Sequence, residues 1–164
     1  TLAILESIRP YPMSLFWLHC HHLNVEGRKM SKSKGNIYYT ETILKQGYSA
    51  AELRFYLIYN HYRSPVNYAD YLMHSTTGKL RSFRQIVMKL RRKAGQEEAV
   101  ESRLSRKIRR LFKHKMDDDL NVKAAFDGVY TALSGIVPSD LHREEAAGTV
   151  KALRDIDEVL KVVF

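Results

Sequence analysis

The sequence predicts a mainly α protein, in which a small mixed α/β unit is followed by an antiparallel helical bundle. From residue 67 onward, apolar residues recur at helical spacing and we find no strand pattern. Residues 1–66 instead combine one alternating apolar segment with two short helical patterns. Short breaks separate the later helical patterns, and helices joined by short turns pack antiparallel. We therefore expect two units, residues 1–66 and residues 67–164.

The first segments of the chain are expected to support a basic loop at residues 29–36. Residues 1–8 carry a partly helical apolar pattern, which stops at the Arg-Pro-Tyr-Pro segment of residues 9–12. An apolar run at residues 15–18 is followed by alternation that includes Val25, a pattern typical of a short strand or hairpin. The basic loop should therefore extend from a buried platform.

Two short helices are expected after this loop. The first begins at Thr40 and is ended by Gly47. The second opens with a capping box made by Ser49 and Glu52 and ends near His61. Because its residues are nearly all apolar, this second helix should be buried on most sides.

Four longer amphipathic helices are expected in the bundle. Asn67 is a plausible cap for the first, which runs to about Lys93, and the second covers about residues 97–115. The third follows Asn121 and ends near Pro138, and the fourth continues to the end of the chain. The residues predicted to form the core are Leu72, Leu80, Phe83, Val87, Leu90, Leu104, Ile108, Leu111, Phe112, Phe126, Val129, Tyr130, Leu133, Val150, Leu153, Ile156, Leu160 and Val163.

The composition favours a folded protein with an anionic partner. The 164 residues are 45% hydrophobic, which is enough to bury a core, and the net charge of +9 favours nucleic acid over a membrane surface or mere solubility. The single cysteine, Cys20, excludes an internal disulfide and agrees with a reducing compartment. No run is long enough for a membrane-spanning helix and no signal-peptide pattern follows Thr1, so we expect a cytoplasmic location. The absence of an initiating Met hints that the chain is part of a longer protein.

Basic residues are concentrated in the first half of the predicted bundle. Between Lys79 and Lys115 there are fourteen Lys and Arg residues against three Glu residues, which leaves a net charge of +11. Such a ridge on neighbouring helices suits a phosphate backbone, and a solvated face without a partner is the alternative. The residues predicted to contact the backbone are Arg81, Arg84, Arg91, Arg92, Arg103, Arg106, Lys107 and Arg110.

The basic loop is the most specific feature of the sequence. It reads Lys29-Met30-Ser31-Lys32-Ser33-Lys34-Gly35-Asn36, with three ammonium groups in six residues. A Lys ammonium on a long flexible stem can follow phosphate oxygens as their charge moves, and the serines add hydroxyl and backbone donors. We therefore expect a mobile loop that binds a polyphosphate, although solvated basic loops of similar composition are common.

Three other clusters are weaker candidates for a site. His19, Cys20, His21 and His22 could each ligate zinc, but alternation along a strand leaves at most two on one side, so we expect no metal here. Residues 117–119 are three consecutive Asp residues, and helix capping is a better explanation for them than metal binding.

The third cluster, His61, Tyr62 and Arg63, could face a ligand or close the interface between the two units, and we slightly favour the interface.

Several segments, taken in order, resemble the C-terminal half of the cysteinyl-tRNA synthetases. The Lys-Met-Ser-Lys-Ser pentapeptide resembles the second signature of class I aminoacyl-tRNA synthetases, and the loop alone suits many of them. The His-Tyr-Arg-Ser-Pro and Met-Asp-Asp-Asp-Leu-Asn segments point to the cysteine enzymes. The matching residues are 17–19, 27–33, 35–36, 53–55, 61–65 and 116–121.

This resemblance implies a division of roles. Residues 1–66 would be a stem-contact-like unit carrying the loop, and residues 67–164 would bind tRNA(Cys). Lys29 and Lys32 would be catalytic by stabilising the phosphates of ATP, bound with Mg²⁺. Residues Lys29, Met30, Ser31, Lys32 and Ser33 would form the ATP contact.

The same resemblance places several family features upstream of this chain. These are the cysteine site, the first ATP signature and the zinc ligands, so the chain alone is expected to be inactive. Two alternatives remain: a related cysteine ligase that acts on an amino sugar, and a freestanding RNA-binding helical module.

Overall fold

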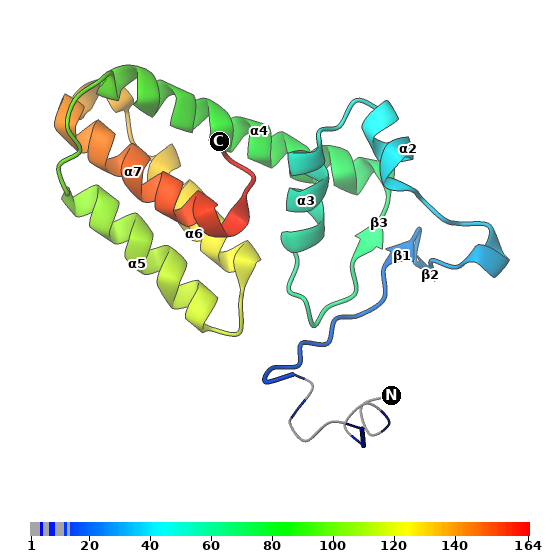
Figure 1. The fold of residues 1–164 in the computed structure, drawn as a ribbon. Helices are drawn as coiled ribbons and strands as arrows, with labels where there is room; N and C mark the ends of the chain where they lie inside the picture. Colours follow the sequence, from blue (N-terminus) through cyan, green and yellow to red (C-terminus); the bar gives the residue numbers. More distant parts are fainter. Residues whose placement is uncertain (1–3, 5–6, 9–11, 13) are drawn as a thin grey trace.

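The computed structural model describes residues 4, 7–8, 12 and 14–164, and it confirms a mainly α fold with a small mixed unit (Figure 1). The helical pattern expected over residues 1–8 lies largely outside the described residues. No helix in the described part of the chain is long and apolar enough to cross a membrane. The elements are β1 (Asn24–Val25), β2 (Arg28–Lys29), a 3-10 helix (Lys32–Lys34), α2 (Thr40–Lys45), α3 (Ala50–Ile58), β3 (Asn67–Tyr68), α4 (Asp70–Ala94), α5 (Arg103–Asp117), α6 (Val122–Ser134), a second 3-10 helix (Pro138–Asp140) and α7 (Arg143–Leu160).

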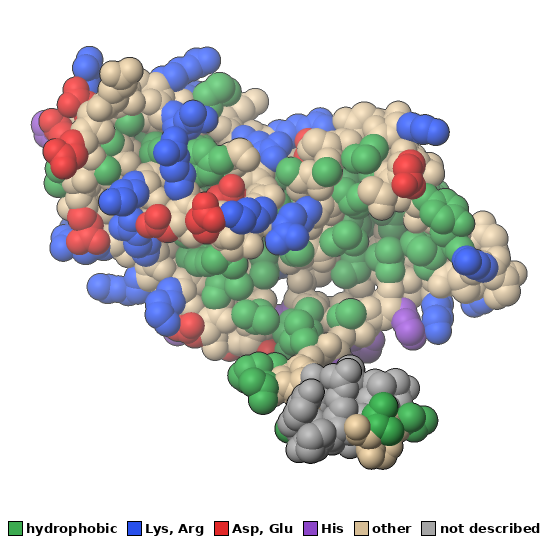
Figure 2. All heavy atoms as spheres, in the orientation of Figure 1, with side chains coloured by type: hydrophobic (Ala, Val, Ile, Leu, Met, Phe, Trp, Pro, Cys, Tyr) green, Lys and Arg blue, Asp and Glu red, His purple; other side chains and the backbone are tan. Residues whose placement is uncertain are grey.

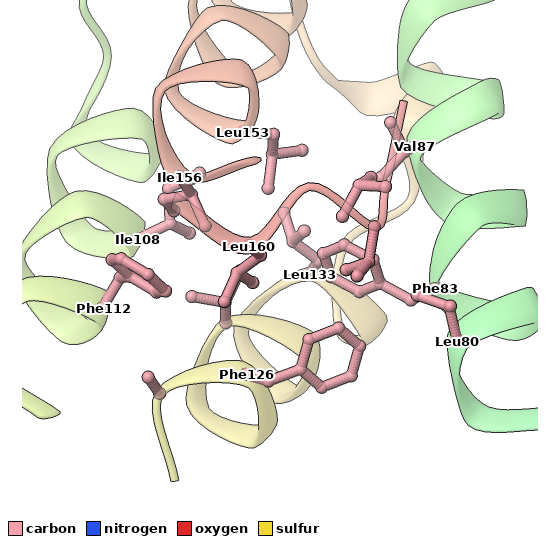
Figure 3. Close-up of a cluster of buried hydrophobic side chains, with 14 of the residues drawn as sticks. Leu80, Phe83, Val87, Ile108, Phe112, Phe126, Leu133, Leu153, Ile156 and Leu160 are labelled. Carbon is pink, nitrogen blue, oxygen red and sulfur yellow. The ribbon is translucent and has the colours of Figure 1, made fainter. Parts of the chain in front are cut away.

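Helices α4 to α7 form the bundle, and α7 packs against both α4 and α5. Their apolar faces meet in one hydrophobic core, part of which is drawn in Figure 3. Gly148 allows a close approach at one end of this core, because a Cβ atom there would lie 1.9 Å from the carbonyl oxygen of Val100. The segment before α5 can therefore cross directly over α7, where the Val100 N–H donates to the carbonyl of Glu144.

A second, smaller core lies beneath the strands. It contains Val25, Ile43, Tyr56, Tyr68 and Met73, which come from β1, α2, α3, β3 and the start of α4. Helix α4 then continues into the bundle (Figure 1). Its residues therefore belong to both cores.

Helix α3 also contributes to both cores. Its Tyr56 side chain is part of the smaller core, whereas Phe55 and Tyr59 pack into the bundle. Their rings lie 4.6 and 5.9 Å from the ring of Phe126, measured between centroids. The capping box expected for α3 is confirmed, because Ser49 and Glu52 each accept a backbone N–H from the other.

The expectation that Asn67 caps a helix and that no strand follows it is wrong. Asn67 and Tyr68 form β3, which pairs in parallel with β1, and Ala69 is the residue at the helix boundary. The Oδ1 atom of Asn67 accepts a hydrogen bond from the Gly27 N–H at 2.7 Å instead. A two-residue strand is stabilised by its distant partner, so local periodicity does not reveal it.

Two further boundaries differ from the expected ones. Helix α5 begins at Arg103, not near residue 97, because Ser102 forms a capping box with Ser105. The Asp residues at 117–119 do not cap the next helix, because α5 extends to the first of them and Asn121 caps α6 by accepting the N–H of Ala124.

The apolar run at residues 15–18 is not a strand and is not buried. These four side chains are 49–89% exposed, and the strand structure begins only at Asn24. The hairpin predicted to lead into the basic loop is therefore confined to residues 24–29.

Candidate functional site

The basic loop emerges from the β1–β2 hairpin. Asn24 pairs with Lys29 and Val25 pairs with Arg28, so the second strand ends at the first lysine of the loop. Val25 is buried in the smaller core, and the Met30 N–H donates to the carbonyl of Leu23 at 3.1 Å. The hairpin thus attaches one end of the loop firmly to the fold.

The side chain of Asn36 closes the other end of the loop. Its Oδ1 atom accepts the Ser31 N–H at 2.9 Å, and its Nδ2 atom donates to the carbonyl of Lys29 at 3.2 Å. Between these contacts the chain makes one 3-10 turn, which Gly35 ends with a φ of 65°, a conformation that favours glycine. The sequence shows an Asn after Gly35, but the two contacts of its amide were not predicted.

The loop presents positive charge without compensation. Lys29, Lys32 and Lys34 are exposed, and within the described part of the chain no carboxylate oxygen lies within 4 Å of their ammonium nitrogens. Arg28, Lys34 and Asn36 line a hollow of about 480 Å³ beside the loop. Cations and amide donors around an open hollow suit an anion with several oxygens, such as a polyphosphate.

The basic residues predicted to bind a phosphate backbone are divided between α4 and α5. Four of them, Arg103, Arg106, Lys107 and Arg110, lie on α5 and are exposed, on the side away from its buried residues. Two more lie in the last turn of α4 and are also exposed. Figure 2 shows Lys and Arg side chains over the bundle, with Asp and Glu side chains among them.

The other two predicted residues make contacts within the chain. The Nε atom of Arg81 lies 2.5 Å from Oε1 of Glu52, and Arg84 donates from Nε to the carbonyl of Val162 at 2.9 Å. Burial raises the pKa of Glu52, but hydrogen bonds from Arg81 and Ser49 outweigh this effect, so its pKa lies below the ordinary value. Arg81 therefore compensates a buried carboxylate, a role that the sequence did not reveal.

The His61–Arg63 segment joins the two parts of the molecule. Tyr62 donates its hydroxyl to Oδ1 of Asp119 at 2.5 Å, and Arg63 donates from Nε to Oδ2 at 2.6 Å. The Nε2 atom of His61 lies 3.6 Å from the same carboxylate. These contacts confirm that the segment closes an interface, here with the turn between α5 and α6.

The pKa of Asp119 is expected to be about 2, below its ordinary value of 3.8, because Arg63 and Tyr62 donate to the ionised carboxylate. Its stabilising effect is therefore complete above about pH 4 and is lost as the pH falls towards 2. Carboxyl ¹³C NMR should show a midpoint near 2 for Asp119, and Arg63→Gln should move it up towards the ordinary value. Arg28→Gln, which removes the same charge elsewhere, should not move it. A midpoint near the ordinary value in the unsubstituted chain would contradict the ion pair.

The histidine-rich segment shows no arrangement for a metal. Cys20 is exposed, and so are His19, His21 and His22. Among the residues that the structure describes, no group of three or more His, Cys, Asp or Glu side chains could hold a metal ion.

Comparison with known proteins supports the resemblance noted in the sequence. A family model described as "tRNA synthetases class I (C) catalytic domain" matches residues 3–78, which include the hairpin and the loop. The cysteine–tRNA ligase of Chlamydia abortus is 30% identical over 169 residues and matches 99% of this chain. This chain belongs to the class I cysteinyl-tRNA synthetase family.

Two further relatives also match nearly the whole of this chain. The cysteine–tRNA ligase of Chlamydia muridarum is 27% identical and matches 99% of the chain, and that of Delftia acidovorans is 34% identical and matches 93%. The similarity therefore includes the helical bundle as well as the loop. The chain covers 36%, 37% and 31% of these three relatives, and so spans about a third of their length.

Proposed function

We propose that this chain supplies two parts of a cysteine–tRNA ligase, which attaches cysteine to tRNA(Cys) with ATP. The loop at residues 29–33 would contact the phosphates of ATP, and the helical bundle would bind the tRNA. The observation that carries the proposal is a loop held at both ends whose exposed lysines have no carboxylate within 4 Å among the residues that the structure describes.

Lys29 and Lys32 would act when cysteine is activated. In that step a carboxylate oxygen of cysteine bonds to the α-phosphorus of ATP, and the bond to the departing pyrophosphate breaks. Negative charge then gathers on the pyrophosphate, where a preorganised ammonium group lowers the barrier. Asn36 would support this action by keeping the backbone of the loop in one conformation.

The loop suits phosphate oxygens rather than a metal ion. Residues 28–36 contain no carboxylate, the ligand that Mg²⁺ usually takes from proteins, so Mg²⁺ would be held here through the phosphates themselves. Binding of cysteine would require parts of the ligase that correspond to the remaining two thirds of the relatives. We therefore expect the 164-residue chain alone not to charge tRNA.

The bundle would contact the tRNA through exposed cations, and four of the predicted contact residues lie on α5. Titration of the chain with transcribed tRNA(Cys) and with a second tRNA, at several salt concentrations, tests this role. We expect affinity to fall steeply as salt rises, with a preference for tRNA(Cys). Absence of binding at low salt would contradict the proposal and favour a ligase that acts on an amino sugar.

A further inference from the structure

A groove between α4 and α7 has the properties of a nucleotide-binding site. Its volume is about 660 Å³, and it lies between the C-terminal end of α4 and the middle of α7. Met88, Ala147 and Val150 contribute apolar surface to it. Its charged lining residues are Arg91, Arg92, Glu97, Lys151 and Arg154.

The positive charge of this groove is not compensated. Its one carboxylate, Glu97, lies 3.7 Å from Arg143 outside the groove. Across the described residues, no carboxylate oxygen lies within 4 Å of the charged nitrogens of the four groove cations. The groove therefore carries four uncompensated cations around an apolar surface.

Elsewhere on the bundle, cations are commonly paired. Arg109 contacts Asp155 at 2.6 Å, and Lys113 contacts Asp117 at 2.5 Å. The Asp155 carboxylate lies on α7 immediately after Arg154, yet it pairs with α5. Cations such as Lys89, Arg103 and Arg110 also have no carboxylate within 4 Å among the described residues, so the groove is distinguished by four such cations gathered around an apolar surface.

Helix electrostatics explain only part of this charge. Arg91 and Arg92 lie in the last turn of α4, where cations interact favourably with the exposed carbonyl groups. Lys151 and Arg154 lie in the middle of the 18-residue helix α7, where that effect is absent. They line the same groove as Arg91 and Arg92, so an anion bound there would meet cations from both helices.

The ring of Phe164 makes cation–π contacts with one arginine from α4 and one from α7. The guanidinium carbons of Arg91 and Arg154 lie 5.8 and 5.6 Å from the ring centroid of Phe164. Such cation–π contacts restrict the arginines without neutralising them. Less side-chain entropy is then lost when they bind a ligand.

We infer that this groove binds one nucleotide of the tRNA, with its phosphate among the four cations and its sugar or base against the apolar surface. The inference rests on the proposed function and adds α7 to the tRNA interface. Lys151 and Arg154 are its distinguishing residues, because the predicted basic ridge did not include them.

The double substitution Lys151→Gln/Arg154→Gln tests the groove. A matched control, Lys45→Gln/Lys161→Gln, removes the same charge at exposed positions outside the groove and outside the predicted ridge. We expect the groove variant to bind tRNA(Cys) roughly tenfold more weakly at moderate salt, and its log–log salt slope to fall by about one, for the one phosphate that the groove holds. The control should stay within about twofold. Circular dichroism would verify that both variants remain folded.

Phosphate ethylation interference gives a second readout. Ethylation of the phosphate in the groove should weaken binding to the unsubstituted chain but not to the groove variant. Equal effects of the two double substitutions, or an unchanged interference pattern in the groove variant, would overturn the proposal that the groove binds a nucleotide. In that case, tRNA binding by the unsubstituted chain would still support the proposed function. No binding by the unsubstituted chain would overturn both.

Discussion

In the complete ligase proposed above, replacement of Lys32 by alanine is expected to lower the rate of ATP–pyrophosphate exchange by about 10²–10³-fold. The reason is that its ammonium group would stabilise charge that develops on the departing pyrophosphate. Lys32 is exposed and begins the 3-10 turn that Gly35 and Asn36 close, so its loss removes charge without disturbing a packed core. The affinity for tRNA(Cys) should remain within about twofold.

Lys45→Ala is the matched control for this experiment. It removes an exposed lysine from the end of α2, outside the loop, and should leave the exchange rate nearly unchanged. Equal losses of exchange rate and tRNA affinity in Lys32→Ala would rule out a specific role in ATP activation. An unchanged exchange rate would mean that the loop is a solvated basic loop with no role in ATP activation.

Replacement of Phe126 by alanine should lower the free energy of unfolding by about 3–5 kcal/mol. Phe126 is 2% exposed, and its ring packs against those of Phe55 at 4.6 Å and Phe83 at 4.8 Å between centroids. The three residues come from α6, α3 and α4. The cavity would therefore open where the unit carrying the loop meets the bundle.

Urea unfolding followed by circular dichroism would measure this change. Phe16→Ala is the matched control, because the same side chain is 89% exposed at residue 16 and its removal should alter the stability by less than about 0.5 kcal/mol. A loss below 1 kcal/mol for Phe126→Ala would mean that the shared core is not packed as described.

The parts of the fold that depend on local chemistry could be predicted from the sequence. Ser49 and Glu52 are three residues apart, and this spacing is sufficient for the capping box that the structure confirms. Leu80, Phe83 and Val87 follow the helical period, and they are buried as predicted because that period places them on one side of α4. The Lys-Met-Ser-Lys-Ser loop is likewise a property of consecutive residues.

The candidate site could likewise be predicted only in part. Its lysines could be found because they are adjacent in sequence, and this adjacency also carries the family resemblance. The amide contacts of Asn36 with Ser31 and Lys29 could not, because they depend on how the turn closes.

Only the tertiary structure decided which distant groups meet. The sequence determined that the chain is a small mixed unit followed by amphipathic helices, with a lysine-rich loop and an excess of cations. The fold then paired Arg81 with Glu52 and joined Asp119 to Tyr62. It placed Lys151 in a groove beside α4, where no carboxylate of the described residues lies within 4 Å of its ammonium nitrogen. Periodicity states which side of a helix is buried, but it does not say which helix lies opposite. The partner of each charged side chain, and thus its function, therefore depends on packing between residues far apart in the chain.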